Sequence, residues 1–218
     1  MRPKLVIFDV DGLLLDTEAL YQKAWAMAEE KYKISGLSSG IFLKCVGRSG
    51  KDAEDVVTGE LGQELGMKIL GEVRKTGKHL LEGTIPVKPG AAAILDRVRE
   101  LKIPRAVATA TSRDLTLKRL RDAGLIDKLD YILCGDQITR RKPDPEIYCK
   151  VLEHFSVEPS RALVLEDSAV GVEAAYRAHI PCIMIPDLVP RSPKQEKETI
   201  AILPSLLDAA ALIEGWQS

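Results

Sequence analysis

Five short apolar runs constrain the fold of this chain more than any other feature. They lie at residues 5–8, 106–108, 131–134, 162–165 and 182–185. Each run is continuous rather than alternating, which is typical of a strand buried on both faces of a parallel sheet. Segments of helical periodicity separate the runs from about residue 86 onward, one of them marked by Ile94, Leu95 and Val98. The pattern predicts an α/β fold with a doubly wound parallel sheet.

Residues 17–82 interrupt this alternation and predict an inserted helical domain. No strand pattern stands out there, whereas Tyr21, Ala24, Trp25 and Ala28 recur at the spacing of one helix face. The return segment 83–90 is rich in glycine and proline, and we expect it to act as a hinge. The predicted organisation is a core made of residues 1–16 and 83–218, with the helical domain spanning 17–82.

Composition narrows the class of protein. The chain has 218 residues, of which 45% are hydrophobic and 29% are charged, and its formal net charge is −1. A net charge near zero gives no indication of nucleic-acid or membrane binding. No apolar run approaches the ~20 residues of a membrane span. The four cysteines are scattered and the three histidines have no metal-ligand spacing. We expect a cytoplasmic protein without a signal peptide, and a monomer is compatible with the sequence.

Two acids follow the first apolar run. Asp9 and Asp11 stand two positions apart before Gly12. Adjacent anions at the end of a buried strand repel each other and are costly to desolvate, so such a pair normally serves a cation or a reaction. The alternative is a solvated turn.

Polar side chains also follow the later runs. Thr109 follows the second run, Glu166 and Asp167 follow the fourth, and Lys142 lies in a basic loop after the third. Ligands of open α/β sheets bind at the carboxyl ends of the strands. Each residue has its own structural alternative, since Thr109 could cap a helix and Lys142 could be solvated. The coincidence of all of them at strand ends favours one site.

In order and context these residues match the four motifs of the haloacid dehalogenase superfamily. The motifs are Phe8-Asp9-Val10-Asp11-Gly12, Thr109, Lys142 and Glu166-Asp167. The helical insert resembles the α-helical type 1 cap of that superfamily, and the resemblance covers essentially the whole chain. The segment from Asp9 to Glu18 is similar to the sugar-phosphatase and β-phosphoglucomutase branch. The resemblance therefore implies a Rossmann-like core with a cap and an enzyme acting on a small phosphomonoester.

The resemblance also implies the chemistry of the two acids. Asp9 would attack phosphorus and form an aspartyl-phosphate, while Asp11 would protonate the leaving oxygen and then deprotonate the attacking water. Thr109, the amide of Ala110 and Lys142 would hold the phosphate oxygens.

A cation is required because a phosphate ester would otherwise meet several negative charges. Oxygen ligands without His or Cys select a hard ion such as Mg²⁺. By resemblance, Asp9 and Asp167 bind the ion through their carboxylates, Asp11 through its backbone carbonyl, and Glu166 indirectly or through water.

The predicted cap carries the residues that would separate phosphatase from mutase and select the substrate. Phosphoglucomutases of the matching branch use a histidine where this chain has Tyr21, which favours hydrolysis because a phenol of pKa ~10 is a poor proton shuttle. For Tyr21 itself we favour a packing role, because it shares one helix face with Trp25 and Ala28. Arg48 matches the cap's substrate loop, with Lys44 nearby, but both could be surface charges.

Three alternatives remain open at this stage. They are β-phosphoglucomutase-type transfer, a phospho-acceptor signalling module, and a non-enzymatic sugar-phosphate-binding protein. The acceptor of a receiver module lies after a later strand and the module has no helical insert, so both Asp9 and residues 17–82 count against it.

Overall fold

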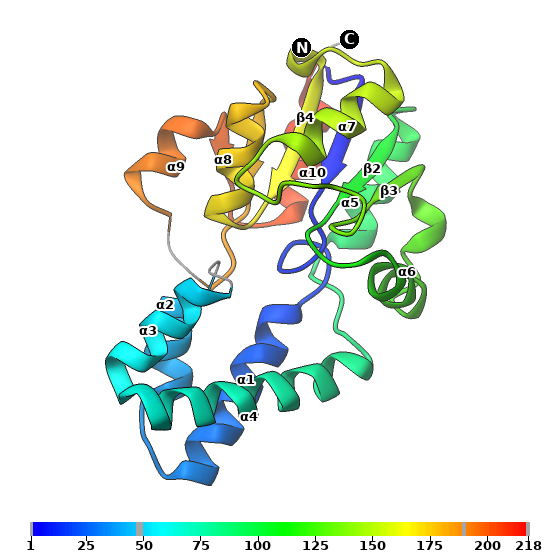
Figure 1. Ribbon diagram of the computed structural model, residues 1–218. Helices are drawn as coiled ribbons and strands as arrows, with labels where there is room; N and C mark the ends of the chain where they lie inside the picture. Colours follow the sequence, from blue (N-terminus) through cyan, green and yellow to red (C-terminus); the bar gives the residue numbers. More distant parts are fainter. Residues whose placement is uncertain (1, 47–49, 189–190, 217–218) are drawn as a thin grey trace. The chain divides into compact units, whose positions relative to one another are not determined.

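The computed structural model describes residues 2–46, 50–188 and 191–216, which belong to two units (Figure 1). The sheet unit consists of Met1–Leu15 and Pro86–Ser218, and the helical unit consists of Asp16–Ile85. The predicted boundaries lie after residues 16 and 82, whereas the chain passes between the units after residues 15 and 85.

All six strands of the sheet unit run parallel, as the continuous apolar runs predict. The sheet has the order β3-β2-β1-β4-β5-β6. The strands are β1 (Leu5–Phe8), β2 (Arg105–Ala108), β3 (Tyr131–Leu133), β4 (Ala162–Glu166), β5 (Cys182–Met184) and β6 (Ala201–Ile202). Five of them coincide with the five runs. The sixth was not predicted, because a half-buried strand of two residues has too little pattern to be recognised.

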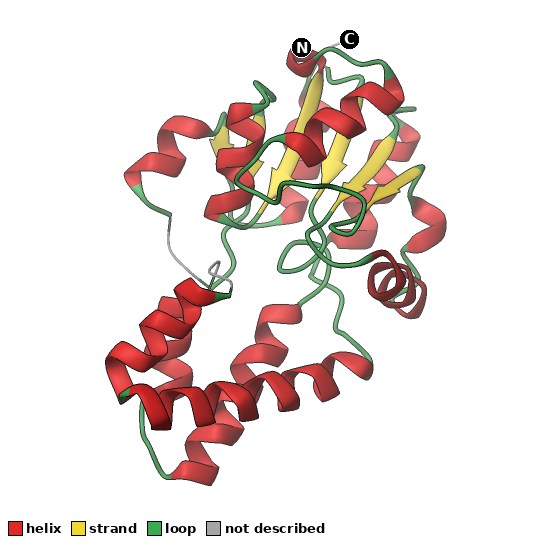
Figure 2. Cartoon of the chain, viewed as in Figure 1, coloured by secondary structure: helices red, strands yellow, loops and turns green. Residues whose placement is uncertain are grey.

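Helices cover both faces of this sheet, which confirms the doubly wound architecture (Figure 2). On one face, α7 (Glu146–Phe155) and α8 (Ala169–Arg177) pack with Leu5 and Ile7 of β1 in one apolar cluster. Side chains alternate along a strand, so Val6 and Phe8 point to the opposite face. There α5 (Ala91–Glu100) and α10 (Leu206–Gly215) pack against each other.

Short elements complete the sheet unit. They are α6 (Arg113–Asp122), α9 (Pro193–Glu198) and two 3-10 turns, Ile126–Lys128 and Pro159–Arg161. The chain leaves the sheet unit after Leu15 and re-enters it at Pro86, and these two connecting segments are hydrogen-bonded to each other. Lys88 donates its amide to the Leu14 carbonyl at 3.0 Å, and Leu15 forms an isolated bridge with Val87. The exit and the return of the chain therefore lie side by side in this unit.

Among the residues that the structure describes, the inserted unit contains helices and the turns between them but no strand. Its elements are α1 (Thr17–Tyr32), a π-helical turn (Leu37–Ile41), α2 (Phe42–Cys45), α3 (Lys51–Leu61) and α4 (Gln63–Glu82). Helix α4 is amphipathic and buries Ile69, Leu70 and Val73. Trp25 of α1 and Phe42 of α2 face each other with ring centroids 6.3 Å apart. No helix within the described ranges combines the length and the apolar character of a membrane span.

Candidate active site

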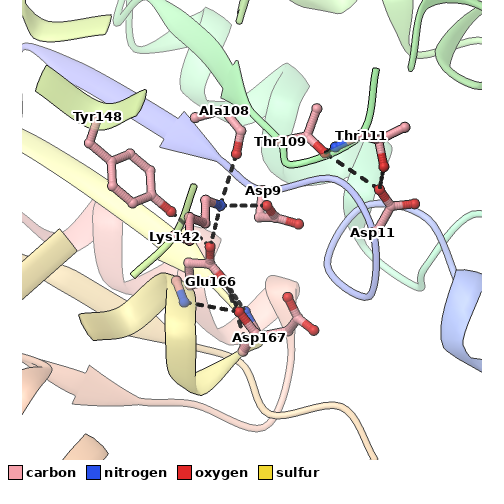
Figure 3. A network of polar contacts seen from close by, with 11 residues as sticks. Asp9, Asp11, Ala108, Thr109, Thr111, Lys142, Tyr148, Glu166 and Asp167 are labelled. Carbon is pink, nitrogen blue, oxygen red and sulfur yellow. Dashed lines mark hydrogen bonds and ion pairs between the residues drawn. The ribbon is translucent and has the colours of Figure 1, made fainter. Parts of the chain in front are cut away.

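Three of the predicted residues follow three adjacent strands. Asp9 comes directly after β1, Thr109 after β2 and Asp167 after β4, and these strands are neighbours in the order β2-β1-β4. The Asp9 amide donates to the Leu165 carbonyl at 3.1 Å and the Thr109 amide to the Leu133 carbonyl at 3.1 Å, so each residue continues the sheet ladder. Parallel strands end at one edge of the sheet, and the three side chains gather there (Figure 3).

Lys142 is the centre of the polar network at this edge. It lies in the loop between β3 and α7, and its side chain is only 6% exposed. The Nζ atom lies 2.7 Å from Asp9 Oδ1, 2.6 Å from Glu166 Oε1 and 3.0 Å from the Ala108 carbonyl oxygen (Figure 3). The three bonds satisfy all three donors of the ammonium group. The predicted loop lysine is therefore buried and joined to two of the predicted acids.

Burial and charge shift the pKa values of this cluster in opposite directions. Burial, together with the neighbouring Glu166 charge, raises the pKa of Asp9 to about 7 although Lys142 opposes this shift. Burial would also raise the pKa of Glu166, but Lys142 and several hydrogen bonds outweigh it, so that pKa is lowered. Burial would lower the pKa of Lys142, yet the charges of Asp9 and Glu166 raise it well above its ordinary value. The positive charge of Lys142 is therefore not sufficient to offset the burial of Asp9 and the nearby Glu166 charge.

Glu166 is fully enclosed, and both of its carboxylate oxygens accept hydrogen bonds. The Tyr148 hydroxyl donates to Oε1 at 2.8 Å, in addition to Lys142. The amide of Asp167 and both the amide and the hydroxyl of Ser168 donate to Oε2 at 3.1, 3.2 and 3.0 Å. Its side chain is 0% exposed. In this arrangement Glu166 holds Lys142 and the start of α8 in place.

Both carboxylate oxygens of Asp11 also have partners. The Thr111 hydroxyl donates to Oδ2 at 2.6 Å and the Thr109 hydroxyl lies 3.4 Å from the same atom. Arg119 Nη1, from α6, donates to Oδ1 at 3.0 Å. The side chain of Asp11 is 25% exposed, so it is the more accessible of the two acids of the first motif.

Glycine is required at two positions of the site. Gly12 has φ +88°, a left-handed conformation, and a Cβ atom there would overlap the Asp167 carboxylate. A Cβ atom at Gly171, in the first turn of α8, would overlap the Glu166 carboxylate. The motif glycine therefore allows the first loop to lie directly against Asp167.

A second acid shapes the loop that carries Lys142. Glu146, the first residue of α7, accepts the amide of Thr139 at 2.9 Å and the amide of Arg140 at 2.8 Å. These bonds, with help from Lys150, lower the pKa of Glu146 to about 2. One carboxylate thus closes the loop of residues 139–146 at its base.

The donor set at this edge fits a hard divalent cation. Asp9 and Asp167 offer carboxylates on adjacent strands, and the raised pKa of Asp9 shows that its ionised form needs more positive charge than Lys142 supplies. Among the described residues, no three side chains of His, Cys, Asp or Glu converge as ligands. A backbone oxygen, such as the Asp11 carbonyl that the resemblance implies, would add a further oxygen ligand to the two carboxylates. Glu166 already accepts five hydrogen bonds, which suits an indirect role.

The three residues of the helical unit that were predicted to matter for substrate or activity differ in what the structure shows of them. Arg48 lies outside the described residues. Lys44 is 57% exposed and forms an ion pair of 2.6 Å with Glu60, as a surface charge does. The ring of Tyr21 lies against Gly77 of α4, where a Cβ atom would come within 2.8 Å of it, so packing is one role of Tyr21.

The helical unit also contains a cavity of about 300 Å³. Trp25 and Phe42 give it apolar walls, while Glu18, Tyr21 and Arg74 add polar groups. Mixed linings of this kind are typical of sites for small polar molecules with an apolar side.

Four residues of the network were not identified from the sequence as parts of the site. Tyr148 shares an apolar helix face with Ile147 and Val151 and so has the pattern of a core residue. Thr111, Arg119 and Glu146 stand in polar segments, where their residue types carry no distinguishing signal. The partners of Thr111 and Arg119 lie 100 and 108 positions away in the chain.

Comparison with known proteins agrees with these observations. Residues 6–185 match the family described as haloacid dehalogenase-like hydrolase. The chain is 34% identical over 176 residues to a phosphorylated carbohydrates phosphatase of Thermotoga maritima, covering 80% of this chain and 81% of that protein. It is 30% identical over 181 residues to a validoxylamine A 7′-phosphate phosphatase of Streptomyces hygroscopicus, covering 83% and 84%. A crystal structure of CbbY from Rhodobacter sphaeroides in complex with phosphate superimposes with a TM-score of 0.69 at 26% identity, covering 94% of this chain and 95% of that one.

Proposed function

This chain belongs to the haloacid dehalogenase-like hydrolase family, and from that premise we propose that it is a Mg²⁺-dependent phosphatase of phosphorylated sugars or closely related metabolites. One observation carries the proposal. A buried carboxylate, Asp9, stands beside a buried lysine and one loop away from a second, more accessible acid, Asp11. This is the set that phosphoryl transfer through an acyl-phosphate needs: a nucleophile, an electrophilic clamp and an acid–base group.

The two acids divide the reaction between them. An Asp9 carboxylate oxygen attacks phosphorus, the bond between phosphorus and the ester oxygen breaks, and that oxygen takes the proton held by Asp11. Asp11, now ionised, accepts a proton from water as the water oxygen attacks the same phosphorus. The bond between phosphorus and Asp9 then breaks, which releases inorganic phosphate and restores both acids.

Other residues hold the phosphoryl group during transfer. Lys142 donates to Asp9 in the free protein and is near enough to share its charge with phosphate oxygens when substrate is bound. The Thr109 hydroxyl and the amide of Ala110, an exposed residue, follow the same strand end and complete the proposed cradle. Asp9, Asp167 and the Asp11 carbonyl would hold Mg²⁺, which neutralises the phosphate charge when bound.

The substrate class follows from the relatives. One relative, at 34% identity, is named a phosphorylated carbohydrates phosphatase, and another, at 30%, a validoxylamine A 7′-phosphate phosphatase, and the matches cover 80% and 83% of this chain. Tyr21 stands where the resemblance implies a histidine in mutases, which supports hydrolysis over transfer. We place selectivity among such phosphates in the helical unit, where the cavity with Trp25 and Phe42 lies.

The test is hydrolysis of p-nitrophenyl phosphate with and without Mg²⁺, followed by a screen of sugar phosphates. We expect turnover that requires the metal and falls by at least about 10³-fold in Asp9→Asn. Asp127→Asn, a change of the same kind at an exposed position, should leave the rate unchanged.

Two results would count against the proposal. Turnover without a divalent cation, or an Asp9→Asn variant as active as the natural chain, would exclude the mechanism. Incubation with β-glucose 1-phosphate and a bisphosphate primer distinguishes the mutase alternative, because a mutase would accumulate glucose 6-phosphate rather than free phosphate.

A further inference from the structure

A buried arginine approaches the proposed acid–base residue from outside the four sequence motifs. Arg119 lies on α6, and its side chain is 9% exposed. Its Nη1 atom donates to Asp11 Oδ1 at 3.0 Å, while the Thr111 hydroxyl donates to Oδ2 at 2.6 Å. The two donors hold the two oxygens of one carboxylate, which fixes the plane of the group as well as its position.

Arg119 serves Asp11 rather than the general cohesion of α6. Within the part of the chain that the structure describes, Asp11 is the one acid that forms an ion pair with this guanidinium. The Arg119 Nε atom is buried and has no hydrogen-bond partner there. A buried guanidinium with a single ionic partner is costly to retain unless that pair has a use, since apolar residues of similar size usually pack as well.

Thr111 is itself held firmly enough to act as the second donor. Its carbonyl accepts the Gly135 amide at 2.9 Å, and its amide donates to the Thr109 hydroxyl at 3.2 Å. The Thr111 backbone is therefore hydrogen-bonded both to the loop after β3 and to Thr109, the residue that follows β2. The carboxylate of Asp11, by contrast, belongs to a loop and is 25% exposed.

We propose that Arg119 is a positioning residue of the reaction, which with Thr111 sets the orientation in which Asp11 exchanges its proton with the leaving group and with water. This inference rests on the proposed phosphatase function and adds a residue to it. Free rotation of the Asp11 side chain would let its carboxylate leave the line of proton transfer, and the Arg119 contact removes that freedom. Arg119 touches neither the phosphorus nor the nucleophile in this assignment.

The leaving group provides the first test. Phenolate leaves less readily than p-nitrophenolate and depends more on the proton from Asp11, although the two aryl phosphates have similar shapes. We expect Arg119→Met to lower kcat/KM for phenyl phosphate by roughly 10- to 100-fold and for p-nitrophenyl phosphate by less than about 3-fold. Arg119→Lys keeps a charge near Asp11 without the planar fork, and should recover part of the phenyl phosphate activity.

A double-mutant cycle provides the second test. With Asp11→Asn in place there is no carboxylate to orient, so adding Arg119→Met should change kcat/KM for p-nitrophenyl phosphate by less than about 2-fold. Arg121→Met is the matched control, because Arg121 is an exposed arginine on the same helix. It should behave as the natural chain with both substrates.

The possible outcomes distinguish the proposed role of Arg119 from the proposed phosphatase function. Equal losses on the two aryl phosphates, or a loss from Arg119→Met that persists in the Asp11→Asn background, would show a merely structural role and overturn the inference. A natural chain inactive on both substrates with Mg²⁺ would overturn the function and the inference together. If Arg119→Met does not give a cooperative thermal transition, Arg119→Lys and Arg119→Gln are judged by the same ratio of the two substrates.

Discussion

At the scale of single residues, the site is organised by an imbalance of charge. Lys142 is shared between Asp9 and Glu166, and all three side chains are nearly inaccessible to solvent. Glu166 has four further hydrogen bonds and stays ionised, so the Lys142 charge is largely neutralised on that side. Asp9 is left with too little positive charge around it, and this deficit, which its raised pKa reflects, supports the proposed binding of a cation at this point.

This deficit predicts how Mg²⁺ affinity depends on pH. The pKa of Asp9 in the metal-free protein is raised from 3.8 to about 7, so below pH 7 the cation must displace a proton. The stability that protonation gives the metal-free fold is lost as pH rises through 7, and Mg²⁺ restores it there. We expect apparent Mg²⁺ affinity to fall by about tenfold per pH unit below 7 and to level off above it.

The measurement is a Mg²⁺ titration followed by thermal unfolding at pH 6 and pH 8. The rise in Tm at a fixed Mg²⁺ concentration should be larger at pH 8. Asp9→Asn removes the titrating group and should give the same small rise at both pH values. An equal rise at both pH values in the natural chain would contradict the assignment of Asp9 as a ligand.

At the scale of elements, the loop that carries Lys142 depends on the first turn of the helix that follows it. Glu146 accepts two amides of that loop, and Asp144 accepts the amide of Glu146 at 2.9 Å. Tyr148, two positions further along α7, places its ring 4.9 Å from the Lys142 ammonium, and its hydroxyl donates to Glu166. One helix end thus fixes both the loop backbone and the lysine side chain.

We predict that Glu146→Gln weakens the fold and the activity together. The amide cannot accept the two backbone bonds with the strength of an ionised carboxylate, so Lys142 is held less accurately and kcat falls by roughly 10-fold. The pKa of Glu146 is lowered from 4.5 to about 2, so its contribution to stability is present above pH 4.5 and is lost as pH falls towards 2.

Urea unfolding of the two proteins at pH 7 and near pH 2 checks this prediction. The difference between their midpoints should be clear at pH 7 and should close at the acid end. Glu153→Gln, an exposed change on the same helix, serves as the control and should leave the midpoint unchanged at pH 7. A difference that persists unaltered near pH 2 would exclude the carboxylate as its cause.

At the scale of the whole molecule, the polar network of the proposed active site belongs to the sheet unit alone. Every hydrogen bond of Asp9, Asp11, Lys142 and Glu166 described above lies within Met1–Leu15 and Pro86–Ser218. The sheet unit also has its own apolar core between the sheet and helices α7 and α8. The two segments that connect it to the helical unit pair at Leu15 and Val87, so a short linker can replace the helical unit without distorting the sheet unit.

We therefore predict that a chain in which a short glycine–serine linker replaces residues 16–85 still folds. It should unfold cooperatively, bind Mg²⁺ and hydrolyse p-nitrophenyl phosphate. It should lose at least about 100-fold in kcat/KM on the best sugar phosphate, because substrate positioning and exclusion of water are lost. Circular dichroism with thermal unfolding reports the fold, and the same two substrates report the chemistry.

The control for this experiment is the shortened chain carrying Asp9→Asn, which should be inactive on p-nitrophenyl phosphate. A shortened chain that keeps the sugar-phosphate preference of the full chain would refute the assignment of selectivity to the helical unit. Failure of the shortened chain to fold would show that the sheet unit depends on residues 16–85 for its stability.

The local sequence alone determined the strands, the helical insert and the residues at the strand ends. Continuous apolar runs and chain breakers act over a few residues, so the ends of β1, β2 and β4 were predictable, together with the acids and the threonine that follow them. β6 was not predicted, because two half-buried residues form no recognisable pattern.

The tertiary structure decided which side chains meet. Tyr148 has the sequence signature of a core residue, yet its hydroxyl donates to the Glu166 carboxylate of the candidate site. Arg119 contacts Asp11 across 108 positions of chain, and Lys142 contacts Asp9 across 133. Such pairs are set by the order of strands in the sheet and by the rotation of each packed helix, neither of which is encoded in any short stretch of residues.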